Sequence, residues 1–199
     1  YLSWVGVFDP GMLAAGYRPQ FAEQIDLDEP ARWLEELYYG AGAGAADSAA
    51  YADLHSYLPY DLLTKVDIAS MACSLECRCP FLDHQVVEFA MTLPSRWRVG
   101  RPGKRILRDW AADLLPEEII RRGKMGFGVP VGEWFRGELR GLLEEHLLTA
   151  DSLSRRIFRT EWLGRLIDEH LSGHANHEHR LWSLLMLELW RRRWAPQLG

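Results

Sequence analysis

Residues 57–83 read YLPYDLLTKVDIASMACSLECRCPFLD, and this stretch is the most informative part of the chain. Pro59 lies near the start of a helical pattern, where its missing N–H costs little. The apolar residues that recur at roughly helical spacing are Leu62, Leu63, Val66, Ala69 and Met71. Glu76 and Arg78 follow, and then Pro80 ends any helix. We therefore predict a helix that packs on a core and carries a carboxylate and a guanidinium rigidly into a loop.

The remaining sequence also predicts a mainly α protein, without clear strand alternation or an internal repeat. Besides the central helix, helical patterns cover residues 30–38, 86–93, 106–115, 134–148, 160–171 and 181–194. The last helix is expected to turn four residues inward, namely Trp182, Leu185, Leu189 and Trp190. We interpret the Gly- and Ala-rich residues 41–50 as a linker between an N-terminal helical segment, residues 1–40, and a main helical body, residues 51–199.

The composition indicates a packed globular chain, with 48% hydrophobic residues and nine Trp. A net charge of −5 argues against general nucleic-acid binding. Residues 1–60 hold two basic and nine acidic side chains, whereas residues 61–140 hold thirteen basic and eleven acidic ones. A basic centre in an acidic chain suits an anionic small ligand better than a polymer. No apolar run approaches about 20 residues, so no membrane span is expected.

Three cysteines, Cys73, Cys77 and Cys79, lie close together in the central stretch. Their odd number, in a chain without the pattern of a secretory signal, predicts a reducing, cytoplasmic setting. The spacing suggests zinc, but zinc sites usually combine two such pairs, and the sequence has no second one. We therefore predict no metal site.

A histidine cluster offers a second possible metal site, made of His170, His174, His177 and His179. These residues lie where a helical pattern ends and Ser172 and Gly173 interrupt it. Because such positions often cap helices or face solvent, we prefer a capping or surface role.

Two candidate site elements remain. The glycine-rich loop over residues 121–130 places Lys124 beside Gly126 and Gly128, where a backbone can approach a ligand and a lysine can neutralise phosphate oxygens. From the residues alone, a solvated run of charges is the simpler interpretation of this loop. Glu76 can orient or deprotonate an amine, or hold a substrate ammonium group. The alternative for Glu76 is a buried structural ion pair with Arg78 or with a base from residues 96–108.

Two ordered blocks of the sequence resemble the C-terminal synthetase domain of glutamine-hydrolysing asparagine synthetases. The first block comprises Tyr57-Leu58-Pro59, Asp61-Leu62-Leu63, Lys65-Val66-Asp67, Ala69-Ser70-Met71, Ser74-Leu75-Glu76, Arg78 and Pro80-Phe81-Leu82-Asp83-His84. The second comprises Leu115-Pro116, Ile119-Ile120-Arg121-Arg122, Lys124 to Pro130, and Trp134 to Arg140. Long blocks in the right order are far more specific than a short motif. The family resemblance implies small apolar residues at the positions of Cys77 and Cys79, so these two are expected to fill a core.

The resemblance implies that residues 1–199 are a partial asparagine synthetase domain. Its fold would be the C-terminal helical portion of an adenine nucleotide α-hydrolase-like (PP-loop ATP pyrophosphatase) synthetase domain. In that family ATP activates aspartate as an acyl-adenylate, which ammonia from glutamine then attacks. Lys124 would contact the phosphates of the adenylate and of the departing pyrophosphate, with Gly126 and Gly128 beside them, and Glu76 would lie on the substrate side.

The same resemblance implies partners outside the chain. The PP-loop and glutaminase domains of the same polypeptide would supply most contacts to ATP and Mg²⁺, and a homodimer is possible. Residues 1–199 contain no Ser-Gly-Gly-x-Asp-Ser string, so we expect this piece alone not to exchange pyrophosphate with ATP. Alternatives are a related amide-forming synthetase, of the β-lactam synthetase or lasso-peptide cyclase type, and a non-catalytic helical binding module.

Overall fold

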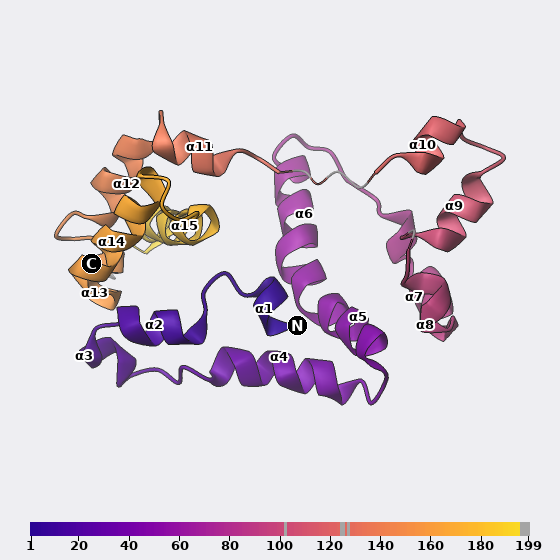
Figure 1. The fold of residues 1–199 in the computed structure, drawn as a ribbon, viewed down its shortest axis with the longest axis horizontal. Coiled ribbons are helices and arrows are strands. Elements are labelled where there is room, and N and C mark those ends of the chain that lie inside the picture. Colours follow the sequence, from indigo (N-terminus) through magenta and orange to yellow (C-terminus); the bar gives the residue numbers. More distant parts are fainter. Residues whose placement is uncertain (102, 124–125, 127, 196–199) are drawn as a thin grey trace. The chain divides into compact units, whose positions relative to one another are not determined.

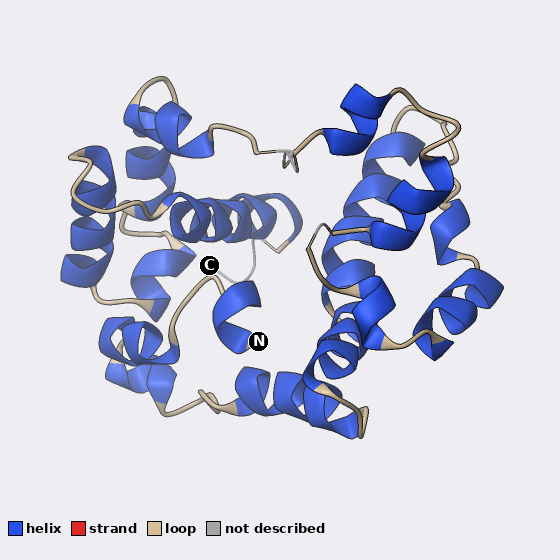
Figure 2. Cartoon of the chain, turned by 45° about the vertical axis from the view of Figure 1, so that its right-hand side comes forward, coloured by secondary structure: helices blue, strands red, loops and turns tan. Residues whose placement is uncertain are grey.

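The computed structural model describes residues 1–101, 103–123, 126 and 128–195 (Figure 1). For residues 2 and 3 it describes the backbone only. These residues form helices joined by loops (Figure 2). Within them, strand-like pairing is limited to one antiparallel bridge between Tyr17 and Phe158. The prediction of a mainly helical chain is confirmed. No helix in the described part of the chain is long and apolar enough to cross a bilayer.

The chain divides into two compact units. Unit 1 combines Tyr1 with residues 31–126, and unit 2 combines residues 2–30 with residues 127–199. Unit 2 contains α1 (Leu2–Val5), α2 (Pro10–Gly16), α3 (Pro19–Ala22), α11 (Val131–Arg136), α12 (Arg140–Leu147), α13 (Leu153–Ile157), α14 (Thr160–Leu171) and α15 (Glu178–Trp194). Unit 2 is therefore assembled from both ends of the sequence.

Apart from Tyr1, unit 1 starts within α4 (Glu29–Gly40), which it contains from Ala31 onward. Its other elements are α5 (Ala45–His55), the π-helical turn η1 (Leu58–Leu63), α6 (Thr64–Met71), the 3₁₀ turn η2 (Pro80–Leu82), α7 (His84–Thr92), α8 (Ser95–Arg98), α9 (Arg105–Ala111) and α10 (Glu117–Arg121). The π-helical turn runs directly into α6, where the Thr64 hydroxyl donates a hydrogen bond to the Pro59 carbonyl at 2.7 Å.

Residues 45–55 differ from the expected linker, because they form α5. The helix begins after Gly44, and the alanines that follow are the strongest helix formers among the amino acids. The Gly and Ala run therefore connects helices only over residues 41–44. The two units also divide the chain at points other than residues 40 and 51.

Unit 2 has a conventional core. Helix α15 packs against α11, α12, α13 and α14. The buried apolar side chains that fill this core are Phe135, Leu143, Leu147, Phe158, Trp162, Leu163, Leu166, Ile167, Leu181, Leu184 and Leu185. Stacked rings extend it toward α2, because Phe158 lies between Tyr17 and Trp162 at centroid distances of 4.9 and 4.8 Å.

The inward face of α15 differs from the prediction. The buried residues are Leu181, Leu184, Leu185, Glu188 and Arg191. Trp182 and Trp190 are 39% and 51% exposed, so placing them inward was wrong. The buried stripe follows helical spacing, but it includes a carboxylate and a guanidinium, which a search for apolar residues passes over.

Unit 1 lacks a comparable core among its described residues. Helices α4, α6, α7, α8 and α10 contain no buried residue. Val66 and Met71, which were predicted to pack on a core, are exposed. Large exposed apolar side chains elsewhere in unit 1 include Tyr60, Ile68, Leu75, Phe81, Phe89, Trp110 and Leu114. Packing of the central helix on a core is therefore not found among the residues that the structure describes.

Candidate functional site

The end of α6 determines where Glu76 lies. Past Met71, the Ser74 amide donates to the Met71 carbonyl at 2.9 Å, and the Leu75 amide donates to the Ser70 carbonyl at 3.0 Å. Ser74 lies in the left-handed region with φ of 57°. This pair of bonds around a left-handed residue is a Schellman cap, which reverses the chain at a helix end. Glu76 is the next residue, so it follows a fixed turn rather than standing on the last turn of a helix.

Glu76 and Arg78 form an ion pair, with 2.7 Å between Oε1 of Glu76 and Nη2 of Arg78. The pair is open to solvent, since the side chains are 66% and 82% exposed respectively. The buried structural ion pair considered for Glu76 is therefore not what the structure contains. An exposed carboxylate with one cation beside it can accept a hydrogen bond from an ammonium or amine group of a ligand.

The glycine loop is described only in part. Lys124 lies outside the described residues, so its pairing with Glu76 across one pocket stays a prediction. Around Gly126 and Gly128, an added Cβ would meet nothing within 4 Å. Neither glycine has a left-handed φ. Nothing in the described chain therefore requires glycine at these two positions, and the backbone there has room on one side for a ligand.

Arg108 of α9 binds backbone carbonyl groups at the start of this loop. Its Nη1 donates to the Ile120 carbonyl at 2.5 Å, and its Nη2 donates to the Arg122 carbonyl at 3.4 Å. A cation at the carbonyl end of α10 satisfies groups that have no partner within the helix. Sequence reasoning counted Arg108 only as one charge of the basic region, because this contact depends on the turn between α9 and α10.

Other basic residues of the region are also engaged within unit 1. Arg98 pairs with Asp47 of α5 and donates from Nε to the Leu93 carbonyl at 2.9 Å. The Arg105 guanidinium lies 5.2 Å from the centre of the Trp97 ring. These arginines therefore join the helices of unit 1, and they are weaker candidates for binding an anion than their number suggests.

The three cysteines are all free and exposed, so the expectation that Cys77 and Cys79 fill a core was wrong. The segment from Leu75 to Cys79 extends away from the cap of α6 and has no helical structure. Nowhere in the described part of the chain do three or more His, Cys, Asp or Glu side chains group as metal ligands would.

The histidines divide into two kinds. His174 and His179 are exposed, as expected, whereas His170 and His177 are buried. The His177 amide donates to Nδ1 of His170 at 3.1 Å, and Nε2 of His170 lies 3.1 Å from the Gly132 carbonyl. His170 therefore carries its proton on Nε2 and joins α14 to α11 and to the start of α15. Burial lowers the pKa of His170.

His177 is held in a similar way. Arg180 donates from Nη1 to Nδ1 of His177 at 3.0 Å, so Nε2 donates to the Glu169 carboxylate at 2.8 Å. This hydrogen bond is the main reason why the pKa of Glu169 is lowered. Both buried histidines are structural connectors, since each ring nitrogen already has a partner.

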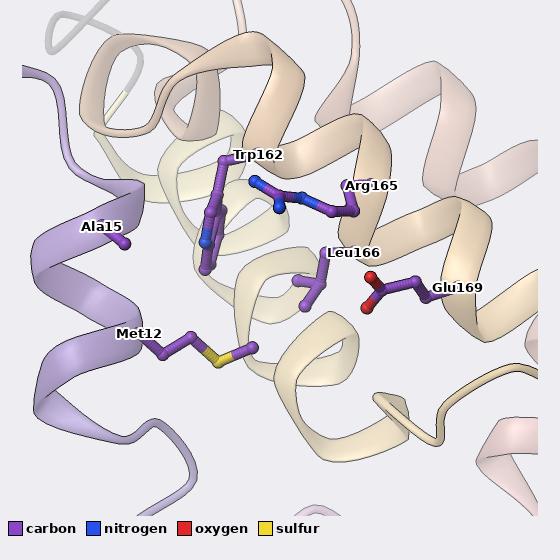
Figure 3. A pocket seen from close by; sticks show the side chains of 6 residues that line it. All are labelled: Met12, Ala15, Trp162, Arg165, Leu166 and Glu169. Carbon is purple, nitrogen blue, oxygen red and sulfur yellow. The ribbon is translucent and has the colours of Figure 1, made fainter.

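Two hollows lie elsewhere. In unit 2, a cavity of about 200 Å³ lies between α2 and α14, with Met12 and Ala15 on one side and Trp162, Arg165, Leu166 and Glu169 on the other (Figure 3). In unit 1, an apolar groove of about 440 Å³ is lined by Ala50, Asp53, Leu54, Tyr57, Leu58, Leu62, Phe81, Leu82, Val87, Ala90 and Met91. Neither hollow is lined by Glu76, Gly126 or Gly128.

Comparison with known proteins agrees with the two sequence blocks. The family model described as asparagine synthase matches residues 10–192. Asparagine synthetase [glutamine-hydrolyzing] 1 of Bacillus subtilis is 28% identical over 83% of this chain and 27% of its own length. A putative asparagine synthetase [glutamine-hydrolyzing] of Mycobacterium bovis is 34% identical over 88% of this chain and 26% of its own.

A mammalian relative matches a shorter part. The asparagine synthetase [glutamine-hydrolyzing] of Mesocricetus auratus is 36% identical over 39% of this chain and 15% of its own length. The chain spans about a quarter of the length of the two bacterial relatives. No solved structure matches it. Because the family model covers residues 10–192, the chain belongs to the asparagine synthase family.

Proposed function

We propose that the chain forms part of an ATP-dependent amide ligase that converts aspartate to asparagine through an acyl-adenylate, with ammonia derived from glutamine. The observation that carries this proposal is the family match over residues 10–192. The names of the bacterial relatives, which describe glutamine-hydrolysing asparagine synthetases, favour aspartate over the substrates of related amide-forming enzymes.

In this function, the loop after α10 binds the phosphates. Lys124 neutralises charge on the phosphate oxygens, and the backbone at Gly126 and Gly128 approaches the nucleotide. The space beside both glycines supports this role, because no atom of the described residues lies within 4 Å of where a Cβ would stand. When bound, ATP supplies the adenylyl group that activates the carboxylate.

Glu76 acts on the substrate side of the same site. Its carboxylate lies 2.7 Å from the Arg78 guanidinium. In this proposal it orients an amine or holds a substrate ammonium group. The described residues provide no cluster of metal ligands, so their donor set does not fit a magnesium site. We therefore assign the coordination of Mg²⁺ to residues outside this set.

The rest of a longer polypeptide would complete the site. The apolar side chains exposed on unit 1 and the greater length of the bacterial relatives both favour this arrangement. We propose that PP-loop and glutaminase domains of the same polypeptide pack against the exposed apolar side chains of unit 1. The homodimer and the cytoplasmic location stay predictions from the family.

The test uses a full-length synthetase that contains this chain and measures aspartate-dependent ATP–pyrophosphate exchange. Lys124→Ala is expected to lower exchange about 10²–10³-fold without unfolding the protein, by analogy with the removal of one preorganised donor from an oxyanion hole. Arg140→Ala is the matched control, because it removes a cation from an exposed i,i+4 pair with Glu144. Unchanged exchange in Lys124→Ala would favour the simpler interpretation, in which Lys124 belongs to a solvated run of charges.

A further inference from the structure

The segment after the cap of α6 carries charged residues and cysteines in alternation. Glu76 and Arg78 are two residues apart and form an ion pair. The residues from Leu75 to Cys79 have no helical structure. Cys77 and Cys79 are likewise two residues apart, separated only by Arg78.

Both thiols are accessible in this chain. All three cysteines are free and exposed, and every residue from Met71 to Pro80 is exposed in unit 1. Cys73 differs in position, because it lies within the capped turn before Ser74, whereas Cys77 and Cys79 lie beyond it. The pair beyond the cap is therefore distinct from the third thiol.

We propose that Cys77 and Cys79 form a reversible disulfide by exchange with a small disulfide such as oxidised glutathione. The Cys77 thiolate attacks one glutathione sulfur, breaks the S–S bond and releases a glutathione thiolate. The Cys79 thiolate then attacks the Cys77 sulfur and releases the second glutathione. Two protein thiols lose two protons and two electrons, and the small disulfide gains them to become two thiols.

Closing this bond bends the segment. Disulfides favour about 5.5–6 Å between the two Cα atoms and a close approach of the two Cβ atoms, so a bond between residues only two positions apart constrains the backbone between them. An exposed disulfide that needs such bending is reduced easily, as labile and regulatory disulfides are. The bend turns Arg78 relative to Glu76, so oxidation opens the ion pair that holds the Glu76 carboxylate.

The first experiment equilibrates the 199-residue chain in glutathione redox buffers, counts free thiols and maps disulfides by mass spectrometry. The wild-type chain and the control Cys73→Ser are both expected to lose two thiols to a bond between residues 77 and 79, and dithiothreitol restores them. Cys77→Ser and Cys79→Ser are expected to form no disulfide within the chain. A bond that requires Cys73, a disulfide between two chains, or only a stable glutathione adduct would overturn the assignment.

The effect on Glu76 is tested separately, and its link to catalysis rests on the proposed function. In the full-length Cys73→Ser protein, oxidation is expected to lower ATP–pyrophosphate exchange and reduction to restore it. A disulfide that forms without changing the exchange overturns the coupling to Glu76 but leaves the thiol site intact. Absence of exchange in the reduced protein contradicts the proposed function and not the thiol chemistry.

Discussion

At the scale of single residues, the Glu188 carboxylate is a buried charge in unit 2 that needs hydrogen-bond partners. Its Oε1 lies 2.7 Å from Nη2 of Arg191, and its Oε2 accepts a hydrogen bond from the Leu153 amide at 2.8 Å. Arg191 also donates to the Asp151 carbonyl at 3.3 Å. The pair thus connects α15 to the start of α13, and both oxygens of the Glu188 carboxylate accept hydrogen bonds, as a buried charge requires.

Glu188→Ala should therefore be strongly destabilising. It leaves the Arg191 charge buried without a counter-ion and the Leu153 amide without its acceptor, and such losses cost about 3–5 kcal/mol. The free energy of unfolding, measured by urea titration of the helical circular dichroism, gives the comparison. Glu144→Ala is the control, because it breaks the exposed pair with Arg140 and should change stability by less than about 0.5 kcal/mol. A similar small loss for both variants would contradict the structural role of Glu188.

Ser74 shows how far residue types alone can locate the candidate site. Arg78 was considered as the partner of Glu76 in a buried ion pair, and the structure contains this pair but leaves it exposed. The capped turn before them was not predicted, because glycine or asparagine usually marks a left-handed residue at a helix end and serine does not. Exposure of Val66, Met71, Cys77 and Cys79 was also missed, since a sequence pattern marks an apolar side chain without showing whether this chain covers it.

At the scale of helices, the bounds of α14 follow from sequence signals, whereas those of α5 do not. Residues 160–171 were predicted as a helix and form one over the same range, because the apolar period is regular and Ser172 and Gly173 interrupt it. The alanines of residues 45–50 gave no amphipathic pattern, so their high helix propensity was overlooked. The predicted helix over residues 134–148 is interrupted between Arg136 and Arg140, where Gly137 ends α11.

The packing of α2 on α14 depends on Gly16, whose lack of a side chain makes room for the Trp162 ring. A Cβ at Gly16 would come within 2.7 Å of the Trp162 ring. Gly16→Ala must therefore displace the ring from its stack with Phe158, and overpacking of this kind costs about 1–3 kcal/mol. The control is Gly164→Ala in α14, where a Cβ meets nothing within 4 Å and should add up to about 1 kcal/mol of helix stability. Urea unfolding measures the change in the free energy of unfolding for each variant. Changes of opposite sign would support the packing, and changes of equal sign would contradict it.

The junction of α11, α14 and α15 should be sensitive to acid. Burial lowers the pKa of His170 below its ordinary value of 6.5, so the unfolded chain binds its proton more readily than the folded chain. His170 therefore destabilises the fold progressively as pH falls through 6.5, and this loss is absent at higher pH. Glu169, whose pKa is lowered by the His177 hydrogen bond, contributes stability that is lost at more acidic pH, below 4.5.

The measurement is urea unfolding between pH 5 and 8 for the wild-type chain and for His170→Gln. The glutamine side chain can donate to the Gly132 carbonyl and accept from the His177 amide without titrating in this range. We expect the wild type to lose stability toward pH 5 and the variant to show a flatter profile. Parallel profiles would mean that His170 does not control this dependence.

At the scale of the whole molecule, the two units differ in how much of their apolar surface they bury. Unit 2 has a contiguous core around α14 and α15, whereas the described helices of unit 1 expose most of their large apolar side chains. Regions with few buried contacts open at lower free energy. Deuterium exchange of the 199-residue chain should therefore be slow in α14 and α15 and fast in α6, α7 and α10. Equal protection of the two sets would contradict this contrast.

The composition of unit 2 from residues 2–30 and 127–199 has a consequence for biosynthesis. Arg18 donates from Nε to the Arg155 carbonyl at 2.6 Å across 137 positions of sequence. At about 5–20 residues per second, a ribosome needs roughly 7–27 s to translate that interval. During this time Tyr17 has no Phe158 to stack on, and the segment around α2 emerges without its partner. The nascent segment around α2 is thus expected to bind a holding chaperone until translation reaches α14.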